Sequence, residues 1–137
     1  MATKSKDGYR AYELGDINEY PVVASDIIYE GSAVGDNASG LARPLVAADP
    51  FLGFCEQQAD NSAGAASAIN VRVKDRGKVV ANVVGATGVG DVGTAVYMSD
   101  DDVFTLTSTS NSLIGKVVRY NSSTECVIAF KSSAIAA

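Results

Sequence analysis

The chain has 137 residues, with 11 Lys and Arg against 16 Asp and Glu, and it contains no His and no Trp. This length predicts one domain with a single core. The net charge of −5 argues against nucleic-acid binding, which needs clustered positive charge. The absence of His excludes His-dependent triads, general bases and metal sites. We therefore expect no enzyme, no catalytic or metal-ligating residue, no cofactor and no nucleic-acid partner.

No segment of the sequence is typical of secretion or membrane insertion. The first eight residues are polar and lack the apolar stretch of a signal peptide. The longest charge-free apolar stretch, 79–90, is shorter than the roughly 18 residues of a membrane span and is broken by Asn82 and two glycines. We expect a protein that is made in the cytoplasm and has no membrane partner.

Residues 1–20 differ from the rest of the chain and predict an extended N-terminal arm. They carry charges of both signs, three of the six tyrosines and no sustained periodicity. Tyrosine combines a large apolar ring with a polar tip, which suits docking onto another protein. A frayed terminus is the alternative. The candidate contact residues of the arm are Tyr9, Tyr12, Leu14 and Tyr20.

Residues 21–137 are expected to form one β domain. Within it, 69–74 alternates apolar and polar residues, as in a half-buried strand. The sequence Asp-Arg-Gly at 75–77 predicts a short hairpin loop, after which 78–84 returns as a second strand. Both faces of that second strand are nearly apolar, which predicts either a central strand or a face covered by a neighbouring subunit. The candidate subunit-interface residues are Val80, Asn82 and Val84.

Other short β-rich runs are separated by Gly, Asn, Asp, Ser and Pro. Two further hairpins are predicted in the C-terminal half, and only 62–68 has room for a helical turn or two. Many short antiparallel strands with close turns predict an all-β fold, a small β-barrel or β-sandwich. The hairpins are 94–98 with 103–107 and 113–120 with 125–130, and shorter strand candidates lie at 22–29, 41–46 and 51–56.

Gly88, Gly90 and Gly93 form a G-x-G-x-x-G pattern after a predicted strand. A dinucleotide site of that type requires a helix to start there, because the N–H groups of the helix N-terminus bind the pyrophosphate. The following residues, 94–98, are β-prone and soon reach a Ser-Asp turn, so a helix has no room. We interpret the pattern as a glycine-rich β-loop.

The acidic and nucleophilic residues mark no catalytic or metal site. The three aspartates at 100–102 lack the spacing of a calcium loop, and we interpret them as a solvated hairpin tip. A carboxylate pair or a Ser–Lys dyad is left open, because no spacing singles one out. Cys55 and Cys126 are interpreted as small buried hydrophobes that are both reduced, with Cys126 on the core face of its strand.

Several short β-turn segments follow one another in order between Ile28 and Phe130. They are IYEGSAVG at 28–35, ARP at 42–44, FLGF at 51–54 leading into ADNSAG at 59–64, VGTAVY at 92–97, DDVFTLT at 101–107 and LIGKVV at 113–118. In this order they resemble the small capsid cement, or decoration, proteins of tailed bacteriophages. The resemblance covers about three quarters of the chain, without the first twenty residues, and depends on the order of the segments.

The resemblance implies a structural virion protein on the capsid exterior. Such a protein binds the outer surface of the expanded head and bridges neighbouring major capsid protein subunits, which stabilises the head against the pressure of packaged DNA. It also implies self-association on a symmetric shell, with a trimer favoured over a dimer. The alternative is a surface adhesion or carbohydrate-binding β-sandwich module, and the absence of Trp counts against it.

Overall fold

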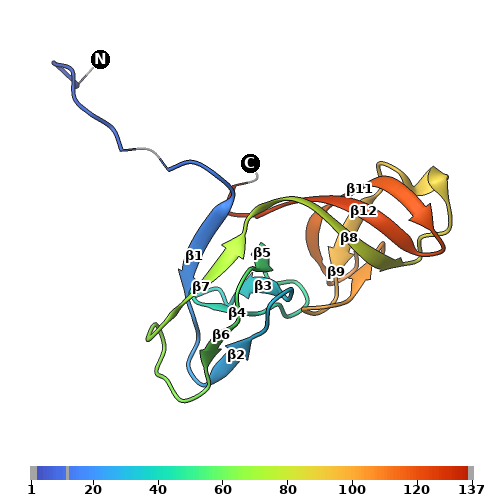
Figure 1. Ribbon diagram of the computed structural model, residues 1–137, viewed down its shortest axis with the longest axis horizontal. Coiled ribbons are helices and arrows are strands. Elements are labelled where there is room, and N and C mark those ends of the chain that lie inside the picture. The colour runs from blue at the N-terminus through green and yellow to red at the C-terminus, as the bar shows by residue number, and fades with distance from the viewer. Residues whose placement is uncertain (1–2, 12, 136–137) are drawn as a thin grey trace.

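The computed structural model of the protein describes residues 3–11 and 13–135, and that part of the chain is all-β (Figure 1). It contains twelve strands and one short 3₁₀ turn, and none of its helices could span a membrane. The predicted fold class is therefore confirmed. The elements are β1 (Ile17–Pro21), β2 (Asp26–Ile28), β3 (Ala33–Asp36), β4 (Ala42–Pro44), β5 (Phe51–Cys55), β6 (Ala59–Asn61), β7 (Asn70–Lys74), β8 (Arg76–Val84), η1 (Val89–Asp91), β9 (Ala95–Met98), β10 (Phe104–Thr105), β11 (Ser112–Ser122) and β12 (Glu125–Lys131).

The strands form a closed barrel with a larger and a smaller sheet beside it. The barrel closes in the order β10-β8-β12-β11-β9, and the larger sheet has the order β1-β7-β5-β3-β4. The smaller sheet is the pair β2 and β6. Two predicted hairpins, β9 with β10 and β11 with β12, are present as antiparallel pairs in the barrel. The pairing of β10 with β8 is parallel, as is the isolated bridge between Val22 and Ala42, so the prediction of antiparallel strands does not hold for these two contacts.

Strand β5 lies between two clusters of buried side chains, where the sequence predicted a single core. Phe51 and Phe54 face the barrel, whereas Leu52 and Cys55 face the cluster under β2 and β6. All five residues of β5 are buried, because both faces of its sheet are covered. The four phenylalanines of the chain meet in the barrel-side cluster, with the rings of Phe54 and Phe130 edge to face at 4.8 Å between centroids. Such contacts fix the sheet against the barrel.

The predicted hairpin at 75–77 is wrong. Strand β7 pairs with β1 and β5, and β8 pairs with β12 and β10, so the chain crosses from the sheet into the barrel at Asp75. Both edges of β7 are already occupied, which leaves no place for β8 beside it. The Asp75 N–H donates to the Asp16 carbonyl oxygen at 2.8 Å, and the Asp75 carbonyl oxygen accepts from the Ser132 N–H at 2.7 Å. Asp75 therefore joins the start of β1 and the end of β12.

The boundary predicted for the N-terminal arm is also corrected. Strand β1 starts at Ile17 and pairs with β7 in five positions, so 17–20 belong to the sheet. These residues escaped prediction because Asn18 and Glu19 are exposed at a sheet edge and give β1 little apolar alternation. The described residues before Ile17 contain neither strand nor helix. An extended arm stays a prediction for that shorter segment.

The region between β1 and β7 contains less regular structure than the sequence predicted. The strand candidate at 22–29 is reduced to β2, and the one at 41–46 is reduced to β4. The predicted helical turn at 62–68 is wrong, because this loop forms successive tight turns instead. The buried Asn61 side chain holds the loop by donating to the carbonyl oxygens of Val23, at 2.8 Å, and Ala65, at 3.0 Å.

Candidate functional site

The N-terminal segment presents two of the four predicted arm contacts to solvent. Tyr9 is 91% exposed and Leu14 is 97% exposed, and Figure 1 shows the described part of this segment lying away from the strands. Tyr12 lies outside the described residues. Tyr20 belongs to β1, where it is half-buried against the β2–β6 cluster. The structure therefore separates Tyr20 from Tyr9 and Leu14 and assigns its ring a packing role.

A polar clamp holds the base of this segment to the sheet and barrel. The Lys74 ammonium donates to the Asp16 carboxylate at 2.5 Å, and the Arg76 guanidinium donates to the Gly15 carbonyl oxygen at 2.9 Å. The hydrogen bond from Lys74 lowers the pKa of Asp16, and the same bond raises the pKa of Lys74. The clamp fixes the point from which the preceding residues emerge.

The outer face of β8 carries the predicted subunit-interface residues. Val80 is 58% exposed and Val84 is 60% exposed, with the exposed Asn82 between them. The alternate residues Val79, Ala81 and Val83 pack into the barrel. Of the two predicted alternatives, a strand buried on both faces does not describe β8 in the single chain, and coverage of this face by a neighbouring subunit stays a prediction. Exposed valines cost solvation free energy, so this face is a candidate for contact with another chain.

The glycine pattern forms a loop closed by its own carboxylate. Asp91 Oδ2 accepts from the Thr87 N–H at 2.7 Å and the Gly88 N–H at 3.2 Å, and these two bonds lower the pKa of Asp91. The short turn η1 ends at Asp91, and the next element is β9, not an α-helix. The N–H groups of Thr87 and Gly88 are therefore already occupied by Asp91. The interpretation as a glycine-rich β-loop is confirmed.

The aspartates at 100–102 close the turn between β9 and β10. Asp100 Oδ1 accepts from the N–H groups of Asp102 and Val103, each at 2.8 Å, as in an Asx turn. Among the described residues, no group of three or more acidic, Cys or His side chains has the geometry to hold a metal ion. The carboxylate of Asp100 therefore stabilises the turn between the two strands.

The two cysteines are buried, unbonded and far apart in the packing. Cys55 belongs to the β2–β6 cluster and Cys126 to the barrel cluster, so their separation into different cores explains the absence of a disulfide. Burial raises the pKa of both thiols. A raised pKa lowers the thiolate fraction, which makes both sulfurs poor nucleophiles. The interpretation of both cysteines as buried core residues is confirmed, and their reduced state stays a prediction that a mass spectrum would check.

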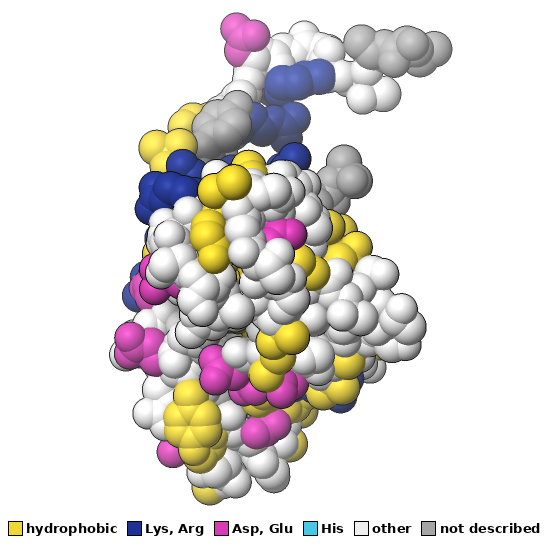
Figure 2. Space-filling view, turned by 90° about the vertical axis from the view of Figure 1, so that its right-hand side faces the viewer, with side chains coloured by type: hydrophobic (Ala, Val, Ile, Leu, Met, Phe, Trp, Pro, Cys, Tyr) yellow, Lys and Arg dark blue, Asp and Glu magenta, His cyan; other side chains and the backbone are white. Residues whose placement is uncertain are grey.

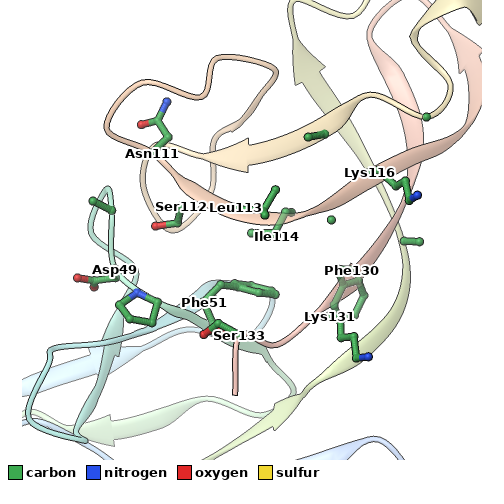
Figure 3. A pocket seen from close by; sticks show the side chains of 16 residues that line it. Asp49, Phe51, Asn111, Ser112, Leu113, Ile114, Lys116, Phe130, Lys131 and Ser133 are labelled. Carbon is green, nitrogen blue, oxygen red and sulfur yellow. Dashed lines mark hydrogen bonds between the residues drawn. The ribbon is translucent and has the colours of Figure 1, made fainter. Parts of the chain in front are cut away.

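A groove of about 810 Å³ lies between the barrel and the loop that precedes β5 (Figure 3). The buried rings of Phe51 and Phe130 and the buried Ile114 line it, and Lys116 and Lys131 stand at one end. Asp49, at the other end, already accepts two hydrogen bonds from Arg43, at 2.8 and 3.0 Å. Sequence reasoning missed this groove, because its walls come from separate segments of the sequence, 48–51, 93–95, 111–116 and 129–133.

Comparison with known proteins identifies no relative of this chain. No family model matches it, and neither a curated protein nor a solved structure does. The likeness to capsid cement proteins therefore depends on the ordered sequence segments alone. The surfaces described above are the observations from which a function is argued.

Proposed function

We propose that this protein is a structural component of a phage virion that binds the outer surface of the expanded capsid. In this role it bridges neighbouring major capsid protein subunits and stabilises the head against internal DNA pressure. The observation that carries the proposal is the exposed N-terminal segment, with Tyr9 and Leu14 almost fully open to solvent, clamped at Asp16 to a compact β body. Large apolar side chains in that position favour contact with another protein.

The distribution of charge supports a role outside the DNA-filled interior. Residues 1–15 contain three basic and two acidic side chains, whereas the rest of the chain contains eight basic and fourteen acidic ones. Figure 2 shows dark blue Lys and Arg side chains gathered near the N-terminal segment, with magenta Asp and Glu side chains further down the body. An acidic body is repelled by packaged DNA, which favours a position on the capsid exterior.

Repetition on a symmetric shell makes weak contacts sufficient. Once one contact forms, the others act at high effective concentration, so a short segment and one barrel face together hold neighbouring capsomers. The proposed partners are the major capsid protein and further copies of this chain, and the proposed role is not enzymatic. The exposed valines on β8 are the proposed self-association surface, with a trimer favoured over a dimer.

The proposal is tested by co-sedimentation with expanded, undecorated phage heads. We expect the full chain to bind at a fixed number of copies per capsid subunit. A variant lacking residues 1–14 retains Gly15, Asp16 and their contacts, so it should fold as the full chain does and lose binding by about tenfold or more.

Two results would contradict the proposal. Failure of the full chain to bind heads would remove the capsid role, and binding on a glycan array would then favour the adhesion module. Unchanged binding by the truncated variant would show that the N-terminal segment is not the contact, even if the capsid role stands.

A further inference from the structure

The groove between the barrel and the loop before β5 contains an open sheet edge. Strand β12 pairs with β11 only from Gly115 onward, whereas β9 pairs with β11 already at Ser112. After Lys131 the chain turns away, and the Ser133 N–H donates to the Phe51 carbonyl oxygen at 2.7 Å. In the described part of the chain, the segment 112–114 therefore has a strand on one side only. Such an edge offers unpaired backbone groups to another strand.

A buried hydroxyl in the groove lacks a partner. Ser112 is 3% exposed, and its Oγ has no hydrogen-bond partner among the described residues. Ser112 lines the groove, and Figure 3 shows its oxygen pointing toward the gap between β11 and the loop that carries Asp49. An unsatisfied buried hydroxyl costs free energy, which is recovered when a ligand supplies the missing hydrogen bond.

The two lysines at one end of the groove are not neutralised. Neither Lys116 nor Lys131 forms an ion pair within the described residues, and both are exposed. At the other end, the charge of Asp49 is paired with Arg43. The groove thus has an apolar floor and one positive end, which suits an apolar ligand with a negative charge at that end.

We propose that this groove binds an extended, acidic peptide segment of another chain by adding a strand to the free edge of β11. The backbone of the segment pairs with 112–114 in line with β12, and it also satisfies Ser112 Oγ. One apolar side chain packs on the apolar lining of the groove, and a carboxylate lies between Lys116 and Lys131. A fatty acid would match the floor and the lysines, but it has no backbone for the edge. The proposal goes beyond the capsid role and does not depend on it.

The experiment titrates the ¹⁵N-labelled full chain with acetyl-Glu-Val-Thr-Val-Thr-amide and with the same peptide carrying Gln in place of Glu. Both peptides should shift amide signals of 112–116 and 131–133. The Glu peptide should bind about fivefold more tightly at low ionic strength, because only it presents a carboxylate to the lysines. In the variant Lys116→Gln/Lys131→Gln this difference should disappear. The control Lys4→Gln/Lys78→Gln removes the same charge away from the groove and should keep the difference.

Ser112→Ala separates a binding role from a structural one. Its hydroxyl has no hydrogen-bond partner among the described residues, so its removal should leave the unfolding midpoint equal or higher. The same substitution should weaken peptide binding about fivefold. Equal affinity for the Glu and Gln peptides, shifts outside the groove, or no shift at millimolar peptide would each overturn the proposal. Shifts of the groove amides with decanoate but with neither peptide would also overturn it and identify a site for an amphiphilic acid.

Discussion

Gly53 is the residue on which the two-sided burial of β5 depends. Its φ is +145°, and a Cβ built there would lie 2.4 Å from the Lys74 carbonyl oxygen. The pairing of β3 with β5 skips Leu52, so the chain has a β-bulge here that turns Phe51 and Phe54 to one face. A side chain at this position would push β5 away from β7.

Gly53→Ala should therefore lower the free energy of unfolding by about 3 kcal/mol. The matched control is Gly90→Ala, because a Cβ at Gly90 would meet nothing within 4 Å. We expect the control to change stability by about 0.5 kcal/mol or less in urea unfolding followed by circular dichroism. Equal effects of the two substitutions would contradict the role assigned to Gly53.

The clamp between Asp16 and Lys74 should respond to acid. Because the pKa of Asp16 is below its ordinary value of 3.8, the clamp is fully present above that value and is lost as the pH falls through the lowered pKa. Side-chain carboxyl chemical shifts of Asp16 measured against pH should show the lowered midpoint. In Lys74→Gln the midpoint should rise toward 3.8, and an unchanged midpoint would mean that Lys74 is not the cause.

Strand β1 connects the N-terminal segment to the sheet and is needed for stability. It covers one edge of β7, and Tyr20 packs against the β2–β6 cluster. Deletion of residues 1–20 should lower the free energy of unfolding by roughly 3 to 5 kcal/mol, because it removes β1 hydrogen bonds and the burial of Tyr20. Deletion of 1–14 should leave stability within about 0.5 kcal/mol of the full chain. The measurement is thermal unfolding of both variants. Equal midpoints would contradict a stabilising role for β1.

The local elements were predictable where apolar alternation or turn residues decide the structure. Strand β7 was predicted from its alternation, and the hairpin of β11 and β12 from the polar residues at 121–124. The crossover at Asp75 was not predicted, because Asp and Gly indicate a sharp change of chain direction but not which strands pair after it. The pairing of β1 with β7 joins residues 49 to 57 positions apart, and no local pattern encodes it.

The candidate surfaces were predictable in part for the same reason. Alternation along 78–84 placed Val80, Asn82 and Val84 on one face, and the structure leaves that face exposed. The groove was unpredictable, because it depends on where β12 stops pairing with β11 and on the position of the loop before β5. Long-range contacts set both.

At the scale of the whole molecule, the exposed face of β8 should control self-association. Val80→Glu places a charge on the proposed interface and should shift sedimentation velocity from an oligomer to a monomer. Val89→Glu is the control, because Val89 is 76% exposed and belongs to η1, outside β8. Both variants should remain folded, since neither valine is buried. Sedimentation of Val80→Glu identical to that of the unmodified chain would rule out this interface.

The polar clamp at the base of the N-terminal segment also determines how the molecule carries a mechanical load. Ile17 pairs with Lys74, so the start of β1 lies beside the end of β7 that leads into the barrel. A force that pulls the N-terminal segment away from the barrel would act on the start of β1 and on the end of β7, which lie side by side. The hydrogen bonds between the two strands would then break one after another, starting from that end. The contacts of Asp16 with Lys74 and of Gly15 with Arg76 lie where that opening begins. The force needed to separate β1 from β7 is therefore set by these few polar contacts, because they are the first to break.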